Sequence, residues 1–231
     1  MNCRALILLL LTLVGCSTLT PKKDLFFIEL RPLSDEKHQI LYSNNRPLII
    51  QQREYIVALQ PAVAQFSTNE SLSFLLAIHN QSDEPLYFDH DTVRIFDTGN
   101  SLDHLKPIKL RDLPLQSPQV ISRIETLLTS LQGLKSAIRD TESYLQGEPK
   151  PATDEAHPQI LHAYMHEQLI PAGYWYGARF EVAMPAREFY LGGLIVALEL
   201  NGETQSFRYQ IAEQLREPQP NRFLSVFEGS E

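Results

Sequence analysis

Alternating apolar and polar positions run through much of the chain and predict β-strands. In the segments 54–60 and 72–79 every second residue is apolar, and the residues between them are mixed. A period of two is typical of a strand that has one face in a core. The turn-forming run Asn80-Gln-Ser-Asp-Glu-Pro85 follows, and a second apolar stretch covers 86–97. This arrangement predicts a hairpin over residues 71–97.

The C-terminal third repeats the pattern. Alternation over 174–184 predicts a strand with Tyr174 and Tyr176 turned inward and Trp175 exposed on the other face. The nearly continuous apolar run 191–200 predicts a central strand. Asn201-Gly202 predicts a two-residue hairpin, since both turn positions need a positive φ. About eight short strands separated by turns predict a mainly β chain folded as an antiparallel β-sandwich. Further strand candidates lie at 25–30, 39–42, 47–51 and 206–211.

Residues 118–146 break this pattern, because their apolar residues recur at spacings of three, four and seven. Ser117-Pro118 is a favourable N-cap and first-turn pair, and Gly147 can close a helix. The segment predicts an amphipathic helical insertion at about 117–147, either one helix or two helices that meet at Gly133. We favour a helix that packs on its own sandwich over one that docks a partner protein. The partner surface would consist of Ile121, Ile124, Leu128, Leu131 and Ile138, with Trp175 as an exposed aromatic.

Composition narrows the class of protein. The 231 residues are 43% hydrophobic and 21% charged, which indicates one folded domain rather than a disordered chain. The formal net charge of -8 argues against nucleic acid as a partner, because phosphate binding needs a concentrated basic face. Two cysteines, Cys3 and Cys16, are too few for a disulfide scaffold or a four-cysteine zinc site. We expect no cofactor.

The N-terminus has the parts of a secretory signal peptide. Arg4 precedes an apolar run over 5–14 that is broken only by Thr12, and the small residue Gly15 comes directly before Cys16. The run is shorter than the roughly 20 apolar residues that span a bilayer. These features predict a signal peptide over residues 1–15.

Leu13-Val14-Gly15-Cys16 closely resembles the lipobox of bacterial lipoproteins. The resemblance implies cleavage between Gly15 and Cys16, diacylation of the Cys16 sulfur and acylation of the new amine. Several acyl chains hold a soluble domain stably at a membrane, whereas one chain binds weakly. Ser17, where Asp would favour the inner membrane, favours the outer membrane. We therefore expect a lipid-anchored protein of the bacterial envelope that faces the periplasm. The alternative is an ordinary signal peptide or an uncleaved anchor with a coincidental cysteine.

Two later stretches resemble the immunoglobulin-like domains of bacterial envelope proteins. Ser71–Phe96, with Asn-x-Ser-x-x-Pro between two strands, is similar to one of their strand–turn–strand units. Ile170-Pro-Ala-Gly173, followed by Gly177 and Phe180, is similar to their return strand. The resemblance implies an immunoglobulin-like antiparallel β-sandwich, although the paired cysteines and core tryptophan of antibody-type domains are not matched. The expected segments after the signal peptide are a lipidated tether at 16–24, the sandwich with its helical insertion at 25–216 and a loose tail at 217–231.

Three histidines offer an alternative function, a periplasmic site for Cu or Zn. They are His157, His162 and His166, and the last two are four residues apart, so they share a face of a helix or of a strand. No HExxH motif is present, because Ile170 stands where its second histidine would be. Surface histidines near a loop are the simpler interpretation.

A remote alternative is an aspartic-type hydrolase, because Asp97-Thr98-Gly99 matches the core tripeptide of aspartic proteases. That chemistry needs two carboxylates that share one proton, and the chain has no second Asp-Thr-Gly or Asp-Ser-Gly. A strand that ends in a β-turn explains the same residues, and Asp89-His90-Asp91 is interpreted as an exposed bend. The favoured function is a non-enzymatic binding or scaffolding module that acts with another envelope protein.

Overall fold

The computed structural model describes residues 26–43, 45–67, 70–98, 104–108, 118–146, 158–183 and 192–215. For residues 26, 97, 104, 136–146 and 213–215 it describes the backbone alone. The chain divides into two compact units, and the larger one, Phe27–Gln214, contains both sheets and the helix.

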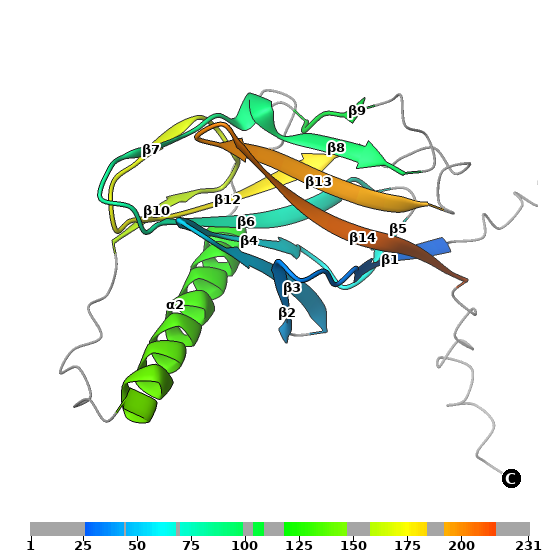
Figure 1. Ribbon diagram of the computed structural model, residues 1–231. Helices are drawn as coiled ribbons and strands as arrows, with labels where there is room; N and C mark the ends of the chain where they lie inside the picture. The colour runs from blue at the N-terminus through cyan, green and yellow to red at the C-terminus, as the bar shows by residue number, and fades with distance from the viewer. Residues whose placement is uncertain are drawn as a thin grey trace, which may run out of the picture. The chain divides into compact units, whose positions relative to one another are not determined.

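Two sheets make up this unit (Figure 1). Sheet A follows the order β11-β7-β13-β14-β1-β5, with β8 beside β13 and β9 beside β8, and sheet B follows the order β10-β12-β6-β4-β3-β2. The pairing of β10 with β12 is parallel, and ten other pairs among the described strands are antiparallel. The strands of sheet A are β1 (Phe26–Pro32), β5 (Phe66–Ser67), β7 (Leu86–Phe88), β8 (Arg94–Asp97), β9 (His104–Leu105), β11 (Gln168–Ile170), β13 (Gly193–Leu200) and β14 (Glu203–Leu215). The strands of sheet B are β2 (His38–Ser43), β3 (Arg46–Gln52), β4 (Tyr55–Pro61), β6 (Leu72–Asn80), β10 (Gln159–His162) and β12 (Trp175–Val182).

The main hydrophobic core lies between the two sheets and draws on the inner faces of both. Phe74 of β6 stacks on Phe180 of β12 with ring centroids 5.2 Å apart, and Phe74 also meets Tyr209 of β14 at 6.0 Å. Every second residue of β12, beginning at Tyr176, belongs to this core, as the alternation predicts. The prediction of a mainly β, sandwich-like chain is therefore confirmed.

Helix α2 (Pro118–Gln146) lies against sheet B on the side away from sheet A (Figure 1). It is a single helix that runs through Gly133 without a break, so the alternative of two helices is wrong. Its apolar face and the outer face of sheet B form a second buried cluster, in which Leu128 and Trp175 are both fully buried. Ser117 and Gly147, the predicted helix ends, lie outside the described residues.

The predicted hairpin over 71–97 is wrong, because the chain changes sheets between β6 and β7. Strand β6 already pairs with β4 on one side and β12 on the other, so no edge is free for β7. The fully buried Asn80 shapes the connection: its side-chain amide donates to the carbonyls of Glu84 at 2.7 Å and Ile170 at 3.0 Å. The turn predicted at 80–85 is confirmed, but it connects strands of different sheets.

Two predictions at the C-terminal end are confirmed. Asn201 and Gly202 have φ values of 48° and 76°, and they connect β13 to β14 as the sequence predicts. Strand β13 is flanked by β14 on one side and by β7 and β8 on the other, so it is central. The bend at 89–91 is confirmed as well, since a 3-10 helix, η1 (His90–Thr92), separates β7 from β8.

Candidate functional site

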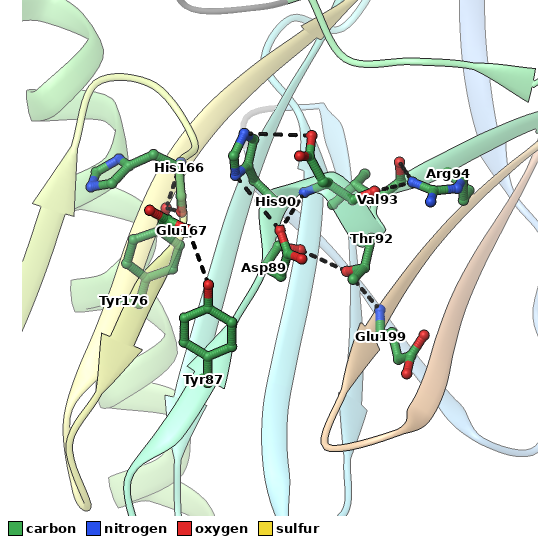
Figure 2. Close-up of polar contacts among 11 residues, drawn as sticks. Tyr87, Asp89, His90, Thr92, Val93, Arg94, His166, Glu167, Tyr176 and Glu199 are labelled. Carbon is green, nitrogen blue, oxygen red and sulfur yellow. Dashed lines mark hydrogen bonds and ion pairs between the residues drawn. The ribbon is translucent and has the colours of Figure 1, made fainter.

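A cluster of polar side chains surrounds the place where the chain passes from sheet B to sheet A. Strand β10 ends in sheet B at His162, and β11 begins in sheet A at Gln168. The residues between them, 163–167, place His166 and Glu167 near Tyr87 and the fully buried Tyr176 (Figure 2). The short strand pair β7–β11 holds this edge of sheet A together.

His162 and His166 are brought into direct contact by this crossing. Their ring centroids lie 3.8 Å apart with the ring planes at 73°, so one imidazole meets the face of the other by its edge. His162 Nε2 lies 3.3 Å from Gln168 Oε1, and His166 Nδ1 lies 3.2 Å from the Tyr164 carbonyl oxygen. Burial, and then the charge of His166, lowers the pKa of His162. Both effects favour the neutral form of His162.

Tyr176 fixes the backbone beneath this pair. Its hydroxyl donates to the carbonyl of His166 at 3.2 Å and accepts from the backbone N–H of His166 at 3.4 Å. Burial raises the pKa of Tyr176 far above neutrality, so its hydroxyl remains protonated. The alternation of 174–184 predicted an inward Tyr176, but nothing in the sequence predicted this bond to a residue of another segment.

Tyr87 and Glu167 form a second contact at the same edge. The Tyr87 hydroxyl donates to Glu167 Oε2 at 3.0 Å, as Figure 2 shows. This hydrogen bond raises the pKa of Tyr87. Tyr87 is 52% exposed, and Leu169, its register partner on β11, is 55% exposed. Nothing in the sequence pointed to the contact between Tyr87 and Glu167, because they lie 80 residues apart and belong to no short motif.

Asp89, His90 and Asp91 form the exposed bend that the sequence predicts. The Asp89 carboxylate accepts from the backbone N–H of Asp91 at 2.8 Å and so caps η1. His90 lies 3.9 Å from Asp89 Oδ1 through Nδ1 and 3.7 Å from Asp91 Oδ1 through Nε2 (Figure 2). Thr92 donates its hydroxyl to the Asp89 carbonyl at 2.7 Å. These contacts explain the local structure of the bend.

The alternative metal site lies only partly within the described residues. The structure brings His162 and His166 together, but His157 lies outside the described residues. Within the described ranges, no group of three or more His, Cys, Asp or Glu side chains is placed to hold a metal ion. Two imidazoles in contact can still supply two nitrogen ligands of the kind that Cu and Zn accept.

Trp175 and three residues of the alternative partner surface, Ile124, Leu128 and Leu131, are buried against the chain itself. This confirms the favoured packing of the helix on its own sandwich and corrects the expectation that Trp175 is exposed. Trp175 has no exposed surface and stacks on His79 with ring centroids 4.5 Å apart. Gly177, two residues on, lets the helix approach: a Cβ there would lie 2.5 Å from Ile124 Cγ2. Within the stripe, Ile124, Leu128 and Leu131 are at most 3% exposed, Ile121 is half-buried, and the side chain of Ile138 lies outside the described residues.

A cleft marks the margin of this helix–sheet contact. It holds about 380 Å³ of empty space, part of which is open to solvent. Apolar side chains from both layers, with three polar ones, make up its lining, which consists of Gln39, Ile50, Gln52, Ile56, Leu131, Leu134, Lys135 and Trp175. The half-buried Leu134 is therefore a stripe residue that its own sheet covers incompletely.

The other candidate residues, at 97–99 and at 15–16, lie wholly or partly outside the described residues. Asp97 ends β8 opposite Leu194, but its side chain and Gly99 lie outside the described residues. Thr98 has a structural contact, because its backbone N–H donates to the Gly193 carbonyl at 2.8 Å. Gly15 and Cys16 also lie outside the described residues.

No family model matches the chain, and neither the curated proteins nor the solved structures contain a match. Among the described residues, no helix is both long enough and apolar enough to cross a membrane. The described part of the chain is a mainly β unit of two sheets, and helix α2 covers sheet B. The polar cluster lies where the chain crosses from sheet B to sheet A.

Proposed function

We propose that this chain is a lipid-anchored protein of the bacterial envelope, held in the outer membrane, facing the periplasm and acting as a non-enzymatic binding or scaffolding module. The observation that carries the proposal is Leu13-Val14-Gly15-Cys16, directly after a short apolar run. The position of Cys16 also supports the proposal, since only residues 17–25 separate Cys16 from β1. A linker of this length would keep the sandwich close to the membrane.

The test of the anchor uses the two cysteines as a matched pair. Cys16→Ala should move most of the protein from the membrane fraction to the soluble fraction and abolish labelling by a palmitate analogue. Cys3→Ala should change neither, because Cys3 would leave with the signal peptide. Unchanged fractionation and labelling of Cys16→Ala would refute the lipid anchor.

We also propose that the sandwich is immunoglobulin-like. Two observations support this: the strand pairing is almost wholly antiparallel, and the resembling segment around Asn80 connects one sheet to the other. Immunoglobulin-like sandwiches pass between sheets through such connections. An experimental structure whose strands superpose in order on an immunoglobulin-like domain would support the assignment, and an unrelated strand order would contradict it.

A second candidate function is periplasmic binding of Cu or Zn, favoured by the contact between His162 and His166. Rotation of either ring could direct a nitrogen of each toward one ion. The test is a titration of the full chain with CuSO₄ and ZnCl₂, followed by calorimetry. Uptake of one ion that is lost in a His162→Ala, His166→Ala variant supports the site. Equal uptake by the wild-type chain and the variant excludes it.

A further inference from the structure

Strand β2 is an unprotected edge of sheet B. Within the described ranges, no strand pairs with its outer side (Figure 1). Its six residues, His-Gln-Ile-Leu-Tyr-Ser, include no proline and no Lys, Arg, Asp or Glu, the residues with which edge strands usually avoid self-association. The other described end strands, β5, β9, β10 and β11, have only two to four residues. Strand β2 is thus the longest described edge that is open to another strand.

The ladder between β2 and β3 shows which backbone groups face this open side. Ser43 pairs with Arg46, so a two-residue loop joins the strands, and the pair that closes such a loop is hydrogen-bonded. Hydrogen-bonded and non-hydrogen-bonded pairs alternate along an antiparallel ladder. Ile40 and Tyr42 are therefore non-hydrogen-bonded toward β3 and direct their N–H and C=O groups outward. Pro47 lies opposite Tyr42 and has no N–H to donate, which agrees with a non-hydrogen-bonded pair at this position.

We propose that two copies of this chain associate through β2, which pairs antiparallel with β2 of the second copy about a two-fold axis at Leu41. In this register Ile40 lies opposite Tyr42 of the second copy, and each pair exchanges both of its main-chain hydrogen bonds. The Tyr42 side chain is 69% exposed in one copy and comes to lie beside Ile40 of the other. The outward groups are thus self-complementary, as a two-fold interface requires.

The register pairs only residues of β2, since residues whose numbers sum to 82 face each other across the axis and Arg46 already belongs to β3. Strand β2 has no Lys, Arg, Asp or Glu, so the two copies bring none of these charges directly opposite each other. The pairing does not depend on the lipid anchor, so its outcome is separate from that of the proposed function.

Disulfide trapping in the full chain tests the register. Across the axis Leu41 faces Leu41 in a non-hydrogen-bonded pair, whose Cα atoms lie about 4.5 Å apart, within the range that a disulfide bridges. Leu41→Cys, oxidised in mild detergent, should give about tenfold more disulfide-linked dimer than the wild-type chain, whose Cys3 and Cys16 set the background. The control is Gln39→Cys, because its two copies would lie roughly 13 Å apart along the strands. It should stay at background.

Loss of one outward N–H tests the hydrogen bonds. Tyr42→Pro should return the Leu41→Cys chain to background and reduce the wild-type mass in light scattering to that of a monomer. Tyr42→Thr, which keeps the N–H, should preserve the dimer; proline on the open side of an edge strand is tolerated. If Tyr42→Pro does not fold, Tyr42→Lys replaces it, because a lysine at this exposed position of an edge strand disfavours pairing and should lower the dimer yield severalfold. A Leu41→Cys yield at background, an equal yield from Gln39→Cys, or a dimer that survives these substitutions would overturn the proposal.

Discussion

The two sheets differ in what covers their outer faces. All nine residues of β6, in the middle of sheet B, are buried, because sheet A covers one face and α2 covers the other. From Thr204 to Ile211, strand β14 of sheet A instead alternates between buried residues and exposed or half-buried ones, which leaves Arg208 exposed while its neighbour Tyr209 is fully buried. A strand buried along its whole length therefore marks a sheet with a covering layer on both faces, whereas alternating burial marks a sheet with one face in solvent.

The largest effect is expected where α2 covers sheet B. Trp175→Ala would remove a fully buried indole between the helix and His79, and we expect a loss of about 3–5 kcal/mol in the free energy of unfolding. Chemical denaturation followed by circular dichroism measures it. A loss below about 0.5 kcal/mol, the scale of most surface substitutions, would show that the helix is not a stable cover of sheet B.

Gly177→Val tests how closely the helix approaches the sheet. The new side chain would meet Ile124 and Leu128, which would have to move, and overpacking of this kind costs about 1–3 kcal/mol. The double variant Gly177→Val, Ile124→Ala should recover part of the loss, because it removes the nearest clashing atom. The same denaturation measurement checks both variants. No recovery would contradict the direct contact between these two positions.

A smaller effect on the free energy of unfolding is expected at His162, where the chain crosses from sheet B to sheet A. The pKa of His162 is lowered from 6.5 in the folded chain, so the unfolded chain binds this proton more readily. The free energy of unfolding should therefore be unaffected well above pH 6.5, fall as the pH drops through 6.5, and level off below the folded pKa. Denaturation at pH 8, 6.5 and 5, compared with His162→Gln, measures the difference. A variant as sensitive to pH as the wild-type chain would assign the dependence to other groups.

The smallest effect is expected on the open face of sheet A. Leu169 is 55% exposed on β11, so Leu169→Ser should change the free energy of unfolding by no more than about 0.5 kcal/mol. The equivalent measurement on Trp175→Ala supplies the contrast between the two faces. A large loss from Leu169→Ser would mean that something covers this face of sheet A.

Local periodicity predicted the helix and most strands well, because those elements follow from short-range spacing. The period near 3.6 predicted α2 from Pro118 to Gln146, and Asn201-Gly202 predicted the turn between β13 and β14. The side-chain alternation of β12 predicted that Tyr176 faces inward. Each of these features is decided within a few residues of chain.

The failures concern partners that are distant in sequence. The turn after Asn80 predicted a hairpin, but Asn80 bonds the carbonyl of Ile170, 90 residues away, and the chain changes sheets. Trp175 was expected to be exposed because its face of β12 is mixed in sequence. Gly177, in the middle of that face, was the available signal, since a glycine within a strand often marks the close approach of another element. The His162–His166 contact was predicted only as a shared face, without the loop that brings the rings together.

The order of the elements along the chain has a consequence for synthesis. Helix α2 ends at Gln146, whereas β12, which carries Trp175 and Gly177 of its docking surface, begins only at Trp175. As the chain emerges from the ribosome, the apolar face of α2 is complete before the β12 part of that surface exists, although β3, β4 and β6 have already been made. For this interval the part of the face that packs on β12 is exposed to misassociation, the situation in which chaperones bind. A chain interrupted between these two elements should therefore aggregate, while one released after Leu215 has every described element it needs.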